Sequence, residues 1–406
     1  MRVDKIHNIA RVVGGPAVGT SFFDRDAVVN KISRRLSDNS ILLVAPRRFG
    51  KTSIMLKVKE MLDKQMGSLN IYLDIEWVTT PSDFITEIIC KVKEATGKDF
   101  LAHIKALPKG IADSLRDNID NLEASGFKIT LRKEIENQWM ERGHELIKSL
   151  NQKNIKITLF ADEFPLMIHN MCKNSKLNPE EIRSFLYWLR SVRLELNLRM
   201  VLGGSIGIDH ILEKLKANAA INDLERVTVA PFDYETAKSF IACLMNTEKV
   251  KISDENMEKI LETVGEPVPY FLQIFVSALL DEIKEQNKPI SDQIITEVYQ
   301  KRILGIQCKS YFDHYFQRLS IYFETEELDI IKALLLHLAE RKEASEKEVF
   351  SIYCNKAKKK NVEQFKMLLD SLQNDFYLVY DSKSQVFRFA TTVLRDLWLR
   401  HYGGLE

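Results

Sequence analysis

The chain has 406 residues, of which 45% are apolar and 28% charged, a composition typical of a globular protein with two or three domains. Its formal net charge is +1, so no overall field draws it to nucleic acid or to an anionic membrane. The five cysteines include no C-x-x-C pair, and no apolar run reaches the ~18 residues of a membrane span. We therefore expect a cytoplasmic protein without disulfides or a zinc site.

The first 24 residues are glycine-rich and predict an extended loop, which ends in the sequence FFDR at residues 22–25. On the residues alone, this end of the loop is held in place by its two aromatic side chains. The pattern of Val28, Ile32 and Leu36 then predicts an amphipathic helix from Asp26 to Leu36.

The stretch ILLVAPRRFGKT, residues 41–52, is the strongest signal in the chain. Ile41–Val44 is a short buried strand, Ala45–Gly50 is a tight loop, and Lys51 opens a helix, which is the context that a phosphate-binding P-loop requires. Lys51 would reach the β- and γ-phosphates of a nucleotide, and the Thr52 hydroxyl would bind Mg²⁺. The nucleotide-binding positions are Pro46, Arg47, Arg48, Phe49, Gly50, Lys51, Thr52 and Ser53. The alternative is a basic loop that caps an ordinary helix.

One position departs from the motif G-x-x-x-x-G-K-[ST]. Its first glycine is replaced by Ala45, so the chain must enter the loop with a negative φ angle. Gly50, Lys51 and Thr52 therefore provide most of the signal.

A second strand is predicted at Asn70–Glu76, followed by a helix over Phe84–Lys93 with Ser82 or Asp83 as its N-cap. Residues 95–150 are expected to be an insertion, mostly helical and polar, and their sequence contains no catalytic or binding motif. Within it we expect a short strand at Lys128–Leu131 and a helix from Trp139 to Leu150.

A further apolar strand, Ile155–Glu163, runs straight into two carboxylates. Asp162 at its end could hold Mg²⁺ opposite Thr52, and Glu163 could act as the general base that polarises the attacking water. The alternative is a strand that ends in two solvated carboxylates, but the upstream Gly-Lys-Thr favours the catalytic interpretation.

A helix that begins at Pro179 precedes a strand at Arg199–Gly203, and Val227–Ala230 is expected as the last strand. Ser205, just after the Arg199–Gly203 strand, is the candidate that senses the γ-phosphate or holds the lytic water. A simple strand-to-turn Gly-Gly-Ser explains the same residues equally well.

From Asp233 the pattern is helical, with a sharp break at Gly265-Glu266-Pro267. After residue 324, three helices and two alternating strands predict a winged helix, closed by a helix over Thr392–Tyr402. Four lysines precede its third helix and favour phosphate contact, whereas two acids on that helix argue against insertion into a DNA groove. The lysines are Lys356, Lys358, Lys359 and Lys360, and the acids are Glu363 and Asp370.

Taken in order, these motifs resemble the archaeal-type ATPase group of the STAND and AAA+ relatives. The matching stretches are GGPAVGTSFFDRD, ILLVAPRRFGKTS, IYLDIEWVTTPSDF, ITLFADEFPLMI, RMVLGGSIGI, VAPFDYETA, GEPVPYFLQ and FRFATTVLRDLWLRHY. The resemblance implies an α/β P-loop domain over residues 1–232 with a parallel sheet of order 5-1-4-3-2. A helical lid at 233–324 and a winged helix at 325–406 would follow it.

The resemblance also implies that Phe23 and Arg25 lie on the base side of the nucleotide and that Pro267 makes the lid contact. The chain has no arginine between Arg226 and Arg302, so the lid lacks the sensor arginine of typical AAA+ motors. This absence fits a nucleotide-dependent switch better than a ring-shaped motor. Arg190 or Arg193 could act as an arginine finger toward a neighbour.

The leading hypothesis is therefore an ATPase that binds ATP and Mg²⁺ and acts as a switch on a protein partner, on its own assembly or on DNA. ATP is favoured over GTP by the resemblance and by the lack of an N-K-x-D motif. One alternative is a nucleotide-controlled DNA-binding or regulatory module. Another is an ATP-binding scaffold that does not hydrolyse, against which Glu163 stands. No membrane partner is expected.

Overall fold

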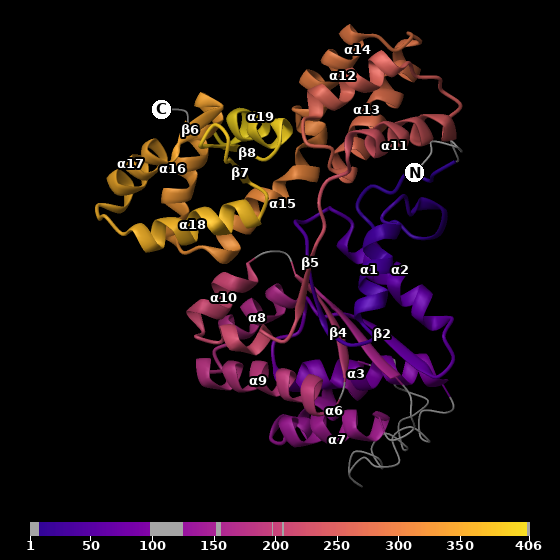
Figure 1. Cartoon of the computed structure of the whole chain (residues 1–406), viewed down its shortest axis with the longest axis vertical. Helices are drawn as coiled ribbons and strands as arrows, with labels where there is room; N and C mark the ends of the chain where they lie inside the picture. Colours follow the sequence, from indigo (N-terminus) through magenta and orange to yellow (C-terminus); the bar gives the residue numbers. More distant parts are fainter. Residues whose placement is uncertain (1–7, 98–124, 152–155, 197, 205–206, 404–406) are drawn as a thin grey trace. The chain divides into compact units, whose positions relative to one another are not determined.

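The computed structural model describes residues 8–97, 125–151, 156–196, 198–204 and 207–403, and its helices and strands are labelled in Figure 1. The chain forms two compact units, each described here by itself. The sheet unit consists of residues 25–45 and 54–229, and the helical unit consists of residues 1–24, 46–53 and 230–406. The division into three domains stays a prediction.

The sheet unit is built on five parallel strands in the order β2-β3-β4-β1-β5. Read from the other edge, this is the expected order 5-1-4-3-2. The strands are β1 (Ile41–Val44), β2 (Ser68–Asp74), β3 (Lys156–Asp162), β4 (Arg199–Gly204) and β5 (Glu225–Thr228).

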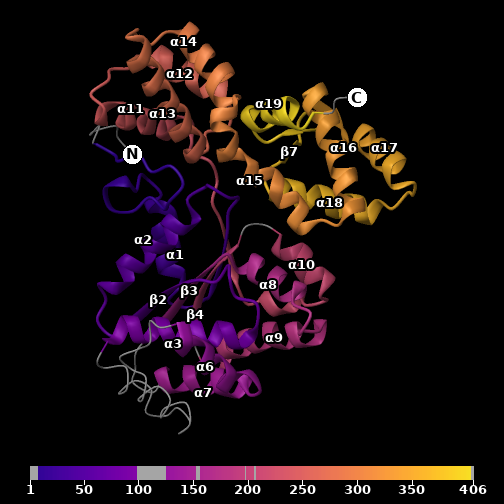
Figure 2. The same ribbon diagram turned by 180° about the vertical axis from the view of Figure 1, so that it is seen from behind.

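The strands at the centre of this sheet are apolar along almost their whole length. Ile41, Leu42 and Leu43 of β1 are fully buried, as expected of a parallel sheet with helices on both faces. Figures 1 and 2 show helices on either side of the strands. The helices of the unit are α1 (Asp26–Arg35), α2 (Lys51–Asp63), α3 (Pro81–Thr96), α6 (Ser125–Glu136), α7 (Trp139–Asn151), α8 (Phe164–Lys173), α9 (Pro179–Glu195) and α10 (Ile208–Lys214), with the 3₁₀ turn η4 (Asn218–Ile221).

Two sequence predictions in this unit are wrong. The strand expected at Lys128–Leu131 is helical and belongs to α6, because Leu131 and Ile135, four residues apart, are both fully buried on one helix face. The N-cap of α3 is Thr80, not Ser82 or Asp83. Its side chain accepts a hydrogen bond from the Asp83 amide, and Pro81 occupies the first helical position.

The described part of the insertion is fastened to α3 by two ion pairs. Arg132 lies 2.9 Å from the Asp83 carboxylate, and Lys128 lies 3.0 Å from that of Glu87. Both carboxylates are buried, so α6 supplies the charges that compensate them. The α6 helix is therefore part of the packed sheet unit.

The first part of the helical unit is a group of helices, the lid helices, which pack on one another (Figure 1). They are α11 (Tyr234–Thr247), α12 (Asp254–Val264), α13 (Pro269–Gln286) and α14 (Asp292–Val298), followed by the π-helical turn η5 (Tyr299–Ile303) and by α15 (Ile306–Tyr322). Gly265, with a φ angle of 81°, breaks the chain between α12 and α13 as predicted. The unit also contains the 3₁₀ turn η1 (Gly19–Ser21).

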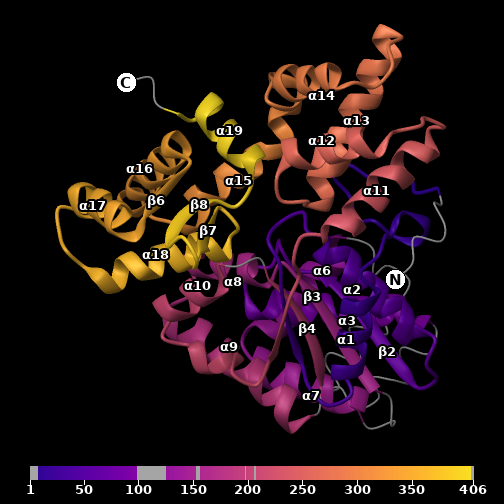
Figure 3. The ribbon, with the colours of Figure 1, turned by 45° about the horizontal axis from the view of Figure 1, so that its top comes forward.

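The C-terminal part of the helical unit has the order of elements of a winged helix, seen clearly in Figure 3. Its elements are α16 (Thr325–Arg341), β6 (Glu343–Ser345), α17 (Glu346–Ala357), α18 (Val362–Asn374), β7 (Leu378–Asp381), β8 (Val386–Phe389) and α19 (Thr392–His401). The three strands form an antiparallel sheet of order β6-β8-β7. The sequence predicts β7 and β8 but misses the three-residue β6.

Candidate functional site

The loop between β1 and α2 has the backbone expected of a phosphate-binding loop. Positive φ angles fall on Arg48 (70°) and Gly50 (87°), and no other atom lies within 4 Å of the Cβ that Gly50 lacks. A side chain at Gly50 would therefore be disfavoured by the backbone angle, not by a clash. Ala45 lies outside these two positions, so the alanine in place of the first glycine is tolerated.

Lys51 is the first residue of α2 and is 7% exposed, although lysine side chains are rarely buried. Ser53, also buried, accepts a hydrogen bond of 2.8 Å from the amide of Ala17. The start of α2, where the free backbone N–H groups of a helix lie, is thus bound to the N-terminal glycine-rich loop.

Three consecutive residues of the loop are each held by a different part of the helical unit. The carbonyl of Arg47 accepts a hydrogen bond of 2.9 Å from the hydroxyl of Tyr315, on α15. Arg48 donates to the carbonyl of Gly14 at 2.8 Å, and its guanidinium lies 4.7 Å from the ring centroid of Tyr270, on α13. These contacts connect the loop to the N-terminal segment and to two helices.

The third residue, Phe49, connects the loop to the winged helix. Its side chain is 1% exposed and meets the ring of Phe376 edge to face, with the ring centroids 4.7 Å apart. The neighbouring Tyr377 donates a hydrogen bond to the backbone carbonyl of Tyr315. Burial raises the pKa of Tyr315 far above its usual range, so its hydroxyl stays protonated and can donate to Arg47.

Sequence reasoning missed Tyr270, Tyr315 and Phe376. They lie more than two hundred residues from the loop along the chain, and each is an ordinary aromatic residue in an apolar pattern. No local signal could have identified them, because what distinguishes them is a contact made only by the tertiary fold.

Asp162 is the last residue of β3, where the sequence places it, and it is 3% exposed. One carboxylate oxygen accepts from the Glu163 amide at 2.9 Å, and the other accepts from the Tyr72 hydroxyl at 3.2 Å. The neighbouring strand carries Gly203, where a Cβ would stand only 2.6 Å from the Asp162 Oδ1. The glycine therefore lets the Asp162 carboxylate pack closely against the backbone of β4.

Glu163 has a left-handed backbone, with φ 59° and ψ 36°, at the N-cap of α8. Non-glycine residues adopt this region at a cost, and such strain is concentrated at functional sites. The turn directs the chain from the carboxyl end of β3 straight into α8, whose Pro165 follows two residues later.

The residues assigned to the base of the nucleotide are placed as follows. The Phe23 ring lies 6.0 Å from that of Phe232 and 5.1 Å from that of Phe240, and the Phe232 amide donates to the Pro267 carbonyl at 3.1 Å. Phe23 and Pro267 are thus joined through Phe232. Arg25 belongs to the sheet unit, where it is the N-cap of α1 with a φ angle of 71°. Ser205 lies outside the described residues.

Arg193 is not placed as an arginine finger. Its side chain is 2% exposed and makes two hydrogen bonds of 2.8 Å to Asp223 and a third of 2.7 Å to the Ala220 carbonyl. It is therefore committed to fixing α9 on η4 within its own chain. Arg190, 3.8 Å from Asp223, is one-third exposed.

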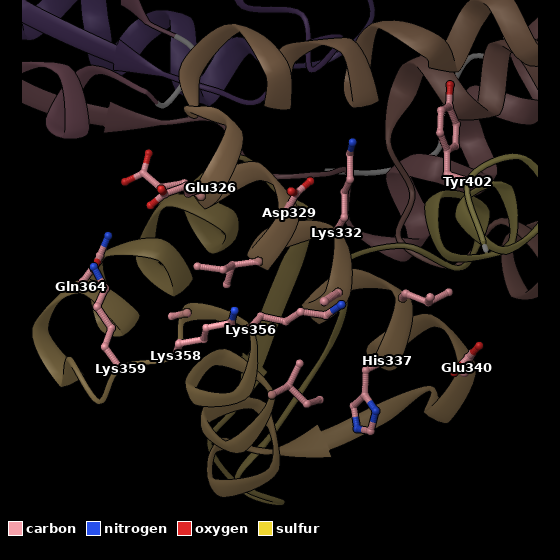
Figure 4. Close-up of a pocket in the computed structure, with 16 residues that line it drawn as sticks. Glu326, Asp329, Lys332, His337, Glu340, Lys356, Lys358, Lys359, Gln364 and Tyr402 are labelled. Atoms are coloured by element: carbon pink, nitrogen blue, oxygen red, sulfur yellow. The ribbon is translucent and has the colours of Figure 1, made fainter. Parts of the chain in front are cut away.

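Three of the four lysines before the third helix of the winged helix line a cavity of about 840 Å³ between α16 and the end of α17. Figure 4 shows Lys356, Lys358 and Lys359 on one wall and Glu326 and Asp329 on the other. The wall contributed by α16 therefore opposes the lysines with acids. A surface with both signs of charge weakens the attraction for a duplex, whose phosphates are uniformly negative.

No described helix is long and apolar enough to cross a membrane. No cluster of three or more His, Cys, Asp or Glu residues in the described ranges could hold a metal by itself.

No protein-family model and no curated protein matches the chain. Among solved structures, the Walker-type ATPase PABY2304 of Pyrococcus abyssi is similar at 16% identity, with a TM-score of 0.61, over 94% of this chain and 97% of the other. The ORC2 protein of Aeropyrum pernix, solved in ADPNP-ADP complexes, is similar at 11% identity, with a TM-score of 0.54, over 93% and 92%. At such low identities the likeness concerns the fold. The chain has the fold of the AAA+-like P-loop ATPases.

Proposed function

We propose that this chain is a Mg²⁺-dependent ATPase in which the bound nucleotide controls the lid helices and the winged helix. The observation that supports this proposal most is the attachment of Arg47, Arg48 and Phe49 to the rest of the helical unit. A phosphate held by this loop acts on residues that already contact α13, α15 and the winged helix. The loop is therefore both the binding element and the first link of a switch.

The phosphate-binding roles follow from chemistry and position. The backbone N–H groups of residues 46–53 and the start of α2 bind phosphate oxygens, and the ammonium of Lys51 neutralises their charge. Gly50 gives the loop its positive φ angle, which a larger residue would adopt only at a cost. Phe23 and Pro267, joined through Phe232, form the base side together with Arg25.

The residues present fit a magnesium ion. Thr52 and Asp162 offer a hydroxyl and a carboxylate, and Mg²⁺ is usually bound by one or two protein oxygens together with substrate phosphates. Gly203 allows the Asp162 carboxylate to lie at its present position against β4, which a larger residue would displace. When bound, the ion neutralises charge on the transferred phosphoryl group.

Glu163 is proposed as the general base that accepts the proton of the attacking water. It directly follows Asp162 and has a left-handed backbone where β3 turns into α8. Ser205 is proposed to sense the γ-phosphate from the end of β4.

The test is steady-state ATP hydrolysis with Mg²⁺ for the wild type, Glu163→Gln and Lys51→Ala, with ATP affinity measured on the same samples. We expect Glu163→Gln to bind ATP normally and to lose most of its turnover, by ~10²-fold or more. Lys51→Ala should lose binding. A wild type that binds ATP without hydrolysing it, even with duplex DNA added, contradicts the ATPase proposal and leaves the scaffold.

A second candidate is a nucleotide-controlled DNA-binding module, and the lysines at the end of α17 favour it. Because the net charge of the chain is only +1, DNA binding would depend on the lysines of this surface and not on the overall charge. Duplex affinity that falls steeply with salt, and that Lys358→Gln and Lys359→Gln reduce, would support it. Absence of binding at low salt, where phosphate contacts are strongest, would rule it out and point to a protein partner or self-association.

A further inference from the structure

The sheet unit contains a second cavity, of about 680 Å³, at the end of the sheet opposite to the P-loop. Its lining places it at the amino ends of β2, β3 and β4, whereas the P-loop follows the carboxyl end of β1. These three strands are neighbours in the sheet (Figure 2). The polar side chains that line it include those of Arg34, Ser68, Asn70, Lys156, Thr158 and Arg199. None of these residues has a part in the proposed ATPase.

The register of the strands gathers these polar residues on one face of the sheet. Asn70 pairs with Thr158, and Thr158 pairs with Arg199 on the next strand. Ser68 and Lys156 form the preceding pair on β2 and β3, two residues earlier and so on the same face. Five polar residues from three strands therefore share one corner of a sheet that is otherwise apolar.

Three cationic side chains line the cavity, and no described lining residue is acidic. Of these cations, Arg34 and Lys156 are exposed, and Arg199 is half-buried. None of the three forms an ion pair with a described residue, and Arg199 has only a 3.4 Å contact to the Ser37 carbonyl. Cations that share a cavity repel one another, and a bound anion removes this repulsion. A site with three cations favours a phosphate group, which carries up to two charges and several acceptor oxygens.

Asn70 calls for a hydrogen-bond donor on the ligand, whereas the cations call for a negatively charged acceptor. Its amide nitrogen donates to Asp63 Oδ1 and to Ser68 Oγ, both at 3.1 Å. Because the Asp63 carboxylate only accepts, the orientation of the amide is fixed. The buried Oδ1 of Asn70, a residue 4% exposed, has no donor among the described residues. A buried acceptor without a donor is costly, so a hydroxyl or amino group here would be favoured.

We propose that this cavity, named here the rear cavity, binds a phosphorylated small molecule that also carries hydroxyl groups. The cations bind the phosphate, Asn70 accepts from a hydroxyl, and Leu36, Leu62 and Ile157 provide the apolar part of the lining. A cavity of this size accommodates a sugar phosphate or a mononucleotide. Both kinds of molecule combine a phosphate group with hydroxyl groups.

The experiment uses the full chain saturated with a non-hydrolysable ATP analogue, so that the P-loop is filled. Inorganic pyrophosphate is titrated by calorimetry into the wild type, Arg199→Gln, Lys156→Gln, Arg199→Lys and the control Lys176→Gln. Lys176 is an exposed lysine outside the cavity, so its variant removes one charge elsewhere in the same unit. Glucose 6-phosphate and AMP follow as separate arms, with glucose and adenosine as uncharged references.

We expect saturable pyrophosphate binding that Arg199→Gln and Lys156→Gln each weaken ~10-fold, or ~1.4 kcal/mol, while Arg199→Lys retains most of it. Lys176→Gln should have no effect. Whichever of glucose 6-phosphate and AMP binds more tightly then identifies the class of ligand. Asn70→Leu should weaken the binding of that ester but not the binding of pyrophosphate. No binding of pyrophosphate, equal weakening by Lys176→Gln, or displacement of pyrophosphate by a short duplex oligonucleotide would each overturn the proposal.

Discussion

Gly203 and Asp162 illustrate how one missing side chain serves a functional group. A Cβ at residue 203 would lie 2.6 Å from Asp162 Oδ1 and 2.9 Å from the sulfur of Met55, closer than side chains tolerate. The next residue, Gly204, offers a matched control. A Cβ there would lie 3.4 Å from Pro165, an ordinary contact.

We therefore expect Gly203→Ala to displace the Asp162 carboxylate and to lower ATP turnover by ~10-fold or more, because a misplaced group loses most of its effect. Gly204→Ala should retain turnover within about twofold. The measurement is ATP hydrolysis as a function of Mg²⁺ concentration. Equal losses in the two variants would show that the strand, not the carboxylate, is what the mutation disturbs.

Asp375 provides a prediction on pH. Burial raises the pKa of its carboxyl to about 6, although the nearby Arg318 acts to lower it. Because the pKa is higher in the folded chain than in the unfolded one, the folded state binds the proton more tightly. The stability from this group is present below pH ~4 and is lost as the pH rises through 6.

Asp375→Asn should therefore raise the melting temperature at pH 7.5, by ~2 °C, and leave it almost unchanged at pH 4.5. Melting curves of the wild type and the variant between pH 4.5 and 8 measure the difference. A constant offset at all pH values would mean that the effect does not come from the titration of Asp375.

Among the secondary-structure elements, α15 and the winged helix contact the P-loop, as does α13 through Tyr270. Tyr315 donates to the Arg47 carbonyl, Tyr377 donates to the Tyr315 carbonyl, and Phe376 packs on Phe49. Phe376 and Tyr377, the two residues just before β7, thus contact the loop directly and through α15. A change of loop conformation on phosphate binding cannot leave these contacts unaltered.

We expect Tyr315→Phe and Phe376→Leu to retain ATP binding within about threefold but to reduce the nucleotide-dependent change in the winged helix. Amide hydrogen exchange of residues 362–389, with and without ATP, measures that change. The control is Tyr380→Phe, which removes a hydroxyl from an exposed tyrosine on β7. If all three variants respond to ATP as the wild type does, the loop contacts do not transmit the signal.

Some helices and strands agree with the prediction from sequence patterns, and others do not. The strands β1, β3 and β4 were predicted within one or two residues, because a fully buried parallel strand is an uninterrupted apolar run. The strand expected at Lys128–Leu131 failed because short alternation does not distinguish a strand from a helix face. The helices α8 and α10 were missed because turn-like residues at their N-termini hid their apolar faces.

For the whole molecule, the notable fact is that the P-loop residues 46–53 group with the helical unit although β1 and most of α2 belong to the sheet unit. The chain therefore passes between the two units on both sides of the loop. The loop to which a nucleotide would bind is therefore continuous along the chain with both units.

We expect Mg²⁺-ATP to raise the unfolding temperatures of both units, since a ligand at 100 times its Kd adds ~2.7 kcal/mol to whatever unfolds with its site. Scanning calorimetry of the full chain, with Lys51→Ala as the control that lacks the shift, measures this. A shift in one transition with the other unchanged would show that nucleotide binding is confined to one unit.

The sequence by itself determined the P-loop, the Asp-Glu pair at the end of β3, the parallel sheet and the winged helix. Each of these depends on local chemistry: a glycine that accepts a positive φ angle, an apolar strand, or a carboxylate that follows it. Only the tertiary structure placed Tyr315 and Phe376 on the loop, fixed Arg193 to Asp223, and gathered Asn70, Lys156 and Arg199 around the rear cavity. These groupings depend on strand register and long-range packing, which join residues that no local pattern relates.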